Sequence, residues 1–226
     1  MESLTTLIEQ YGAQVPVAFW MNVKLTFFAA IGSFLLGVVL ALFRISPVAS
    51  LRAVGAAYVH LVRNTPLTII MLIGVLAVWG QLKITFSDDF DLNFFVFAVI
   101  SLSLYHAAFM CEAIRSGVNT VPLGQAEAAR AIGLGFLPAA RHVILPQALR
   151  GAITPLGNTV IALTKNTTVA AAASVAEASG LMKTMIEFRP DVMVAIFLTF
   201  AIGFCLIVIP IGLLTTWASD RLAVAR

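Results

Sequence analysis

The polar side chains that lie deepest within the apolar stretches of this chain are the first candidates for chemistry. Lys165 lies among amide and hydroxyl side chains, with Thr168 one turn after it and Asn158 seven residues before it. A seven-residue step places Asn158 and Lys165 on one face of a helix. A cation flanked by such donors suits a carboxylate, so these three residues are candidates for a substrate path. The alternative is that Lys165 stabilises a helix break by donating to free carbonyls.

A second polar group lies earlier in the chain, where Arg63, Asn64 and Thr65 directly precede Pro66. Proline removes a backbone donor and bends a helix, which membrane proteins tolerate beside cavities or well-packed neighbours. Ionisable groups inside a bilayer are costly, which makes each one a functional candidate. The three residues therefore either line a path, or Arg63 forms a structural pair with Glu112 or another acid.

The residue types in the apolar stretches do not suggest an enzyme. They contain no paired carboxylates, metal-ligand set or nucleophile–base pair, and His60, His106 and His142 are scattered along the chain. The sequence also lacks a GxxxxGK[ST] phosphate loop. We therefore expect no catalytic residues, no metal site and no cofactor bound by this chain.

Five apolar stretches must position these groups. Of the 226 residues, 60% are hydrophobic and 11% are charged, whereas soluble domains are nearer half apolar and a quarter charged. Crossing a bilayer takes about 20 apolar residues. The sequence predicts one all-α, polytopic membrane domain over residues 1–226, with spans at Val17–Phe43, Leu51–Trp79, Leu92–Ile114, Ala148–Ala173 and Val192–Trp217.

The distribution of basic residues predicts the orientation of these spans. Cytoplasmic loops of membrane proteins carry an excess of Lys and Arg. With the N-terminus outside, the external segments hold only Lys83, Lys183 and Arg189. The cytoplasmic segments then hold Arg44, Arg52, Arg115, Arg130, Arg141, Arg150, Arg221 and Arg226. We therefore expect an N-out, C-in topology.

The loop at residues 115–146 is rich in alanine and arginine and lies between two apolar stretches. Good helix formers over Gly124–Leu134 predict a short helix, with Gly133 at its C-terminal cap. Pro146 is suited to open the next helix, where a missing N–H costs nothing. Glu127 projects from the first turn, where a carboxylate is favoured. A folded basic loop of this kind is either an ordinary amphipathic loop or a docking element for a soluble partner.

The order of residues in this loop resembles the EAA signature of importer-type ABC-transporter permeases. Glu127-Ala128-Ala129 is followed after three residues by Gly133, and after nine more by the sequence Val143-Ile144-Leu145-Pro146, with Val143 where isoleucine is usual. Arg63–Leu67 resembles the RGTPL stretch of polar amino-acid permeases, with Asn64 in place of glycine and His60 in place of glutamate. Pro146–Arg150 and Leu163–Thr168 match the segments that usually follow. These variants look most like the glutamate-uptake permeases of actinobacteria.

The resemblance implies a permease of the bacterial cytoplasmic membrane whose coupling helix fits a cleft on a separate ATPase. The coupling residues it implies are Gly124, Gln125, Glu127, Ala128, Ala129, Gly133 and Leu134. Its implied partners are a pair of ATP-binding subunits that carry the ATP and Mg, a second permease (a paralogue is favoured over an identical copy), and an external binding protein. None of these partners is a nucleic acid.

The charges inside the spans bear on the cargo. Arg63 and Lys165 are cationic, and the fourth span lacks an acid because Thr159 stands where many relatives carry one. This favours L-glutamate, with glutamine, aspartate or asparagine as alternatives. A self-contained secondary transporter would instead predict inverted repeats and a membrane carboxylate for ion coupling. Residues 175–188 fit either a short amphipathic helix at the outer surface or an ordered connector.

Overall fold

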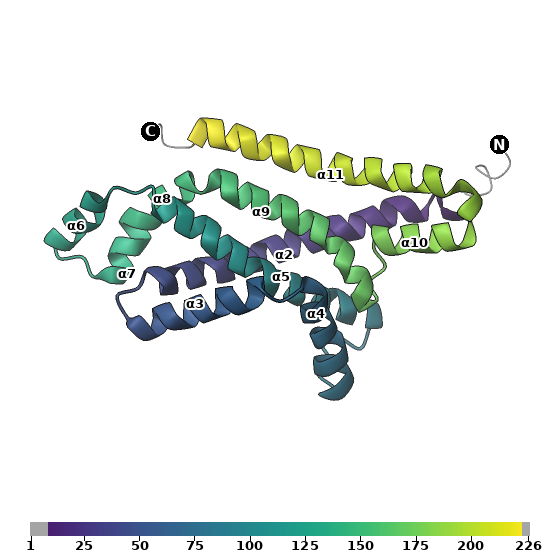
Figure 1. Ribbon diagram of the computed structural model, residues 1–226, viewed down its shortest axis with the longest axis horizontal. Helices are drawn as coiled ribbons and strands as arrows, with labels where there is room; N and C mark the ends of the chain where they lie inside the picture. Colours follow the sequence, from purple (N-terminus) through teal and green to yellow (C-terminus); the bar gives the residue numbers. More distant parts are fainter. Residues whose placement is uncertain (1–8, 223–226) are drawn as a thin grey trace. The chain divides into compact units, whose positions relative to one another are not determined.

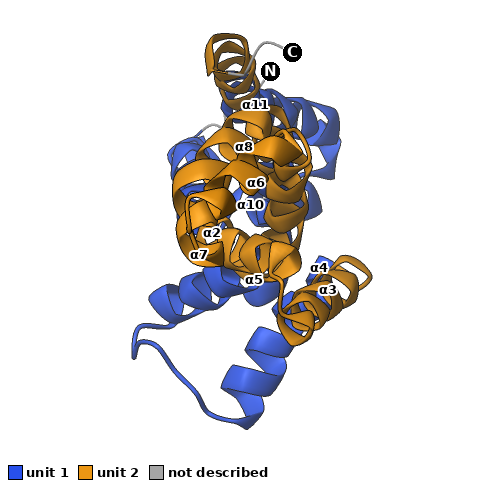
Figure 2. Ribbon diagram, turned by 90° about the vertical axis from the view of Figure 1, so that its left-hand side faces the viewer, with its two compact units in different colours: residues 1–29, 67–102, 162–210 blue, residues 30–66, 103–161, 211–226 orange. Residues whose placement is uncertain are grey.

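The computed structural model describes residues 9–222, and every regular element in that range is helical (Figure 1). The chain forms two compact units, each assembled from three separate segments (Figure 2). Unit 1 consists of the residues up to Ala29 together with Leu67–Leu102 and Ala162–Pro210. Unit 2 consists of Ala30–Pro66, Ser103–Ile161 and the residues from Ile211 onward. The expected basic residue Arg226 lies outside the described residues.

Three long helices form where apolar residues run without interruption. They are α2 (Gln14–Ile45), α5 (Phe90–Val118) and α11 (Met193–Leu222). α2 contains the first predicted span and α5 the third. α11 contains the fifth predicted span except for its first residue. Within residues 9–222 only these three helices are long and apolar enough to cross a membrane by themselves. The candidate span that contains α11 begins at Pro190. The division between the two units falls within each of the three helices.

The second predicted span, Leu51–Trp79, is interrupted as Pro66 suggested. α3 (Ala49–Arg63) ends before the proline, and α4 (Leu67–Leu72) follows and continues into a π-helical stretch, η1 (Ile73–Gln81). Proline disfavours helical geometry at the preceding residue and has no N–H to donate. Together these helices count as a fourth, bent candidate span.

The fourth predicted span, Ala148–Ala173, is not one continuous helix in the structure. α8 (Leu145–Gly151) ends at Ala152, and α9 (Ile153–Asn166) gives way to a 3-10 helix, η3 (Thr167–Ala173). Pro155 lacks the N–H that would continue α8 into α9. At the other end, the hydroxyls of Thr167 and Thr168 donate to the carbonyls of Thr164 and Lys165, in competition with regular helical bonds.

The core of unit 1 lies where α10 (Ala178–Phe188) meets α2 and α11. Met185 of α10 is buried together with Ile196 and Phe200 of α11. The ring of Phe19 on α2 stacks on Phe200, with ring centroids 5.5 Å apart. α10 confirms that the segment 175–188 contains a short helix.

The core of unit 2 is built largely from small side chains. Ala41, Ala107, Ala108 and Cys111 are fully buried, which lets α2, α3 and α5 approach one another closely. The predicted loop at residues 115–146 also belongs to unit 2. It folds into α6 (Leu123–Ala131), α7 (Phe136–Ala139) and a π-helical turn, η2 (Ala140–Ile144), before α8 begins.

Candidate functional site

The helix α6 ends in a left-handed cap at Gly133, as its sequence predicts. Gly133 has a φ of +85°, and its N–H donates to the carbonyl of Arg130. The N–H of Leu134 donates to the carbonyl of Ala129, which completes the two-bond Schellman arrangement. The helix is shorter than the predicted Gly124–Leu134, because the chain turns at Ile132. Pro146 lies in the first turn of α8, also as predicted.

The outer surface of this loop combines apolar and charged groups. Leu123 is 83% exposed and Ile132 is 77% exposed, although both are large apolar residues. Gly124, Gln125, Glu127 and Ala128 are also exposed, and Leu134 is half-buried. Ala129 is only 3% exposed, so its small side chain serves packing inside unit 2. Exposed large apolar side chains such as these are available for contacts with another protein.

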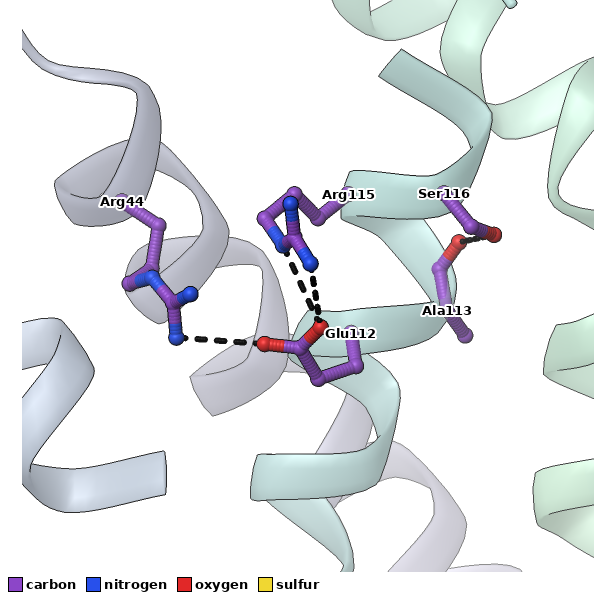
Figure 3. Close-up of polar contacts among 5 residues, drawn as sticks. All are labelled: Arg44, Glu112, Ala113, Arg115 and Ser116. Carbon is purple, nitrogen blue, oxygen red and sulfur yellow. Dashed lines mark hydrogen bonds and ion pairs between the residues drawn. The ribbon is translucent and has the colours of Figure 1, made fainter. Parts of the chain in front are cut away.

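A cluster of charges lies near the ends of three helices in unit 2. The carboxylate of Glu112 on α5 accepts two hydrogen bonds from Arg115, of 2.8 and 3.2 Å, through Oε2. Its other oxygen, Oε1, pairs with Arg44 of α2 at 3.1 Å. Figure 3 shows the two guanidinium groups bound to different oxygens of the carboxylate. Both oxygens of Glu112 are therefore engaged within the chain.

This cluster forms one wall of a cleft of about 470 Å³. We call it the arginine cleft, and it is lined by Arg44, Val59, His60, Arg63, Asn64, Glu112 and Arg115. The guanidinium of Arg63 lies over the ring of Phe109, 5.5 Å from its centroid. Among the ion pairs of the described residues, Glu112 pairs with Arg44 and Arg115 and not with Arg63. Within residues 9–222, Arg63 and Glu112 therefore form no direct ion pair, although the charge of Arg63 acts on Glu112 at longer range.

The structure also places the other predicted path residues. Thr65 donates through its hydroxyl to the carbonyl of Leu61, and Asn64 caps α3. Asn158 and Lys165 are both exposed residues of α9, but the first belongs to unit 2 and the second to unit 1. Thr168 lies three residues after Lys165, and its hydroxyl donates to the carbonyl of Lys165 at 2.8 Å.

Gly157 allows a close approach of α9 and α11. A Cβ built at Gly157 would collide with the side chain of Thr215. The neighbouring hydroxyls of Thr154 and Ser219 also share a hydrogen bond of 2.9 Å. These contacts lie within unit 2 and fix the register of the two helices there.

A buried carboxylate in unit 1 could not be located from the sequence. Glu177 is fully buried and accepts hydrogen bonds from the side chain of Asn22 and from the backbone N–H groups of Ser179 and Gly180. Asn22 also donates to Thr167 and accepts from the N–H of Ala178. The sequence placed Glu177 in the external segment 175–188, interpreted as either a short amphipathic helix or an ordered connector. Its position as N-cap of α10 was the one local signal, whereas Asn22 lies 155 residues away.

Within residues 9–222, long apolar helices and a folded basic loop together describe an all-helical, multi-pass membrane protein. Comparison with known proteins agrees with this class. Residues 33–224 match the family described as binding-protein-dependent transport system inner membrane component. The chain belongs to this family, and is therefore a multi-pass protein of the cytoplasmic membrane, as the sequence predicted.

Two curated relatives and one solved structure extend this result. The glutamate transport system permease protein GluC of Corynebacterium efficiens is 44% identical over 228 residues, which cover 99% of this chain and 100% of the relative. The probable glutamine ABC transporter permease protein GlnM of Bacillus subtilis is 36% identical over 67% of each chain. A crystal structure of an amino acid ABC transporter with histidines matches with a TM-score of 0.79, at 25% identity, over 95% of this chain and 97% of the other. These relatives are transport components, which confirms that this chain is a permease of the ABC importer class and not an enzyme.

Proposed function

We propose that this chain is the permease subunit of an ATP-driven importer for L-glutamate, with glutamine, aspartate and asparagine as alternative cargoes. The observation that carries the proposal is the full-length similarity to a glutamate permease. The charges support it, because the arginine cleft contains three guanidinium groups and only one carboxylate. A surplus of positive charge attracts an acidic amino acid and repels a basic one.

The proposed arrangement in the membrane has five crossings, with the N-terminus outside and the C-terminus inside. α2, α5 and α11 supply three crossings, and the bent pair α3 and α4–η1 supplies a fourth. The fifth combines α8, α9 and η3, whose backbone departs from one straight helix. Irregular backbone at membrane depth is tolerated where it is covered by protein or lines a cavity. In this arrangement residues 1–226 act as one transmembrane domain.

α6 is the proposed coupling helix. The exposed residues Leu123 and Glu127, together with Ile132 at the C-cap, offer apolar contacts and one charge to a partner. The partner is a pair of ATP-binding subunits, which carry the ATP and Mg, while this chain binds no cofactor. Closing of the two ATPases would move the helix, and the well-defined cap at Gly133 would transmit that movement to α8 through η2.

The proposed cargo path draws on two groups of polar residues. Asn158, Lys165 and Thr168 offer amide, ammonium and hydroxyl groups along α9 and η3. Arg63, Asn64 and Thr65 offer similar groups at the end of α3. A second permease, most simply a paralogue, completes the path, and an external binding protein delivers the amino acid. A self-contained secondary transporter would leave the folded loop at α6 without a role.

Uptake by the reconstituted complex tests the proposed cargo. Vesicles that contain the permease pair and the ATPase, supplied with ATP inside and binding protein outside, should accumulate labelled L-glutamate. Unlabelled aspartate or glutamine should compete more strongly than lysine. Accumulation of lysine in preference to glutamate would contradict the proposal.

A further inference from the structure

The arginine cleft has a charge that its own contacts leave unbalanced. Three guanidinium groups and one carboxylate give a net charge of +2 when His60 is neutral, from three positive charges less one negative. Glu112 is the one acid among the residues that line the cleft. Its two oxygens already bind Arg44 and Arg115. Arg63 forms no direct ion pair with Glu112 and acts on it only at longer range, so the net positive charge of the cleft remains.

Helix ends explain part of this arrangement. Arg44, Arg63 and Arg115 each lie in the last turn of a helix, where a cation is favoured by the helix dipole. The dipole effect does not require the three side chains to converge on one cleft. Like charges at close range repel one another, so their convergence is stabilised when an anion is bound between them.

The geometry of Arg63 suits an anion that carries a carboxylate. Its guanidinium lies over the ring of Phe109, which limits the orientations of the side chain. A held guanidinium presents a planar set of N–H donors that matches a carboxylate in a bidentate manner. The amide side chain of the neighbouring Asn64 adds a neutral donor and acceptor at the same wall.

We infer that the arginine cleft binds a carboxylate of the transported amino acid and selects acidic over basic cargo. Arg63 is the group that receives the carboxylate. Glu112 is a positioning residue whose two oxygens hold Arg44 and Arg115. This inference rests on the proposed function for the identity of the cargo.

Direct binding of labelled L-glutamate tests the inference. The complete transporter is assembled in discs of neutral phospholipid without the binding protein, so that uptake is not required. The wild type should bind glutamate saturably, with competition by aspartate and none by lysine. Arg63→Gln should weaken binding about tenfold, the effect of one lost charge-assisted hydrogen bond. Arg63→Lys keeps the charge and should weaken it less.

Two controls separate charge from damage to the fold. Arg150→Gln removes an exposed arginine of unit 2 that does not line the cleft, and should leave glutamate binding unchanged. Asn64→Asp changes the shape of the side chain little but lowers the charge of the cleft, so it should weaken glutamate binding more than Asn64→Ala does. Equal affinity in the wild type and Arg63→Gln, or no glutamate binding by the wild type, would overturn the inference.

A lipid headgroup is the competing source of an anion. Adding an acidic phospholipid to the discs should leave the glutamate affinity unchanged. Displacement of glutamate by that lipid would identify the cleft as a headgroup site and would overturn the inference. A failure of the proposed function is distinguishable, because it would appear as loss of ATPase association or of glutamate uptake in the wild type. An Arg63→Gln complex that assembles, hydrolyses ATP and binds glutamate normally contradicts the inference alone.

Discussion

Asn22 on α2 donates a hydrogen bond of 2.9 Å to the carboxylate of Glu177, and both side chains are fully buried. The same asparagine accepts from the N–H of Ala178 and donates to Thr167. One side chain of α2 thus holds the first turn of α10 and the first turn of η3. A buried carboxylate is tolerated only when its hydrogen bonds are satisfied, so the three segments depend on one another.

Replacing Asn22 should therefore destabilise unit 1. We expect Asn22→Ala to lower the free energy of unfolding by about 2–3 kcal/mol, because a hydrogen bond to a buried charge is lost. Asn22→Asp should be worse, since it places a second carboxylate beside Glu177. Denaturant titration of the purified permease in detergent measures the free energy of unfolding of both variants. Asn119→Ala, at an exposed position, is the control. Wild-type stability in Asn22→Ala would contradict this account of the network.

The cap of α6 predicts a difference between two glycines of the same loop. Gly133 has a φ of +85°, which disfavours any side chain, whereas Gly135 has an ordinary φ of −68°. Neither position is crowded. Gly133→Ala should destabilise the loop by about 1 kcal/mol, the usual penalty for a left-handed backbone. Gly135→Ala should have little effect. Protease sensitivity of the loop reports this difference, and equal sensitivity of the two variants would argue against the cap.

The contact between Gly157 and Thr215 predicts a compensating pair of substitutions. Gly157→Ala should destabilise the protein by about 1–3 kcal/mol, because its new methyl group collides with the threonine side chain. Thr215→Ala removes the two closest atoms and should restore part of the loss in the double variant. Gly212→Ala on α11 meets only an ordinary contact at 3.8 Å and is the matched control. Thermal unfolding in detergent measures all four proteins, and a lack of rescue would argue against this packing.

The proposed cargo path predicts the effect of changing its charge. Lys165→Ala removes the ammonium group, and Thr159→Glu adds a carboxylate at a buried position of α9. Each should lower the rate of glutamate uptake about tenfold or more. Both proteins should still reach the membrane. Lys183→Ala, at an exposed lysine of α10, should transport normally. Unchanged uptake in both path variants would remove these residues from the path.

Much of the fold follows from local patterns in the sequence. Long apolar runs predict α2, α5 and α11, Pro66 predicts the interruption after α3, and Gly133 predicts the end of α6. These features depend on residues a few positions apart, whose backbone preferences are fixed by their own chemistry.

Features that depend on distant partners could not be predicted in the same way. The burial of Glu177 requires Asn22, and Arg44 and Glu112 meet only because α2 and α5 pack together within unit 2. The division of the fourth predicted span was missed for a different reason. Threonine does not interrupt an apolar stretch on a hydropathy scale, so hydropathy gives no sign of a helix break here. In the structure, however, the hydroxyls of Thr167 and Thr168 donate to the carbonyls of the preceding turn.

Association of α6 with the ATPase tests the central claim most directly. The wild-type permease should co-purify with its ATPase, and the complex should hydrolyse ATP faster when substrate-loaded binding protein is added. Glu127→Lys and Gly133→Asp, which reverse the charge of the exposed helix and strain its cap, should each reduce both association and stimulation. Glu187→Lys on α10 is a matched charge reversal and should reduce neither. If association and stimulated hydrolysis survive both changes in α6, the coupling role of this helix is wrong.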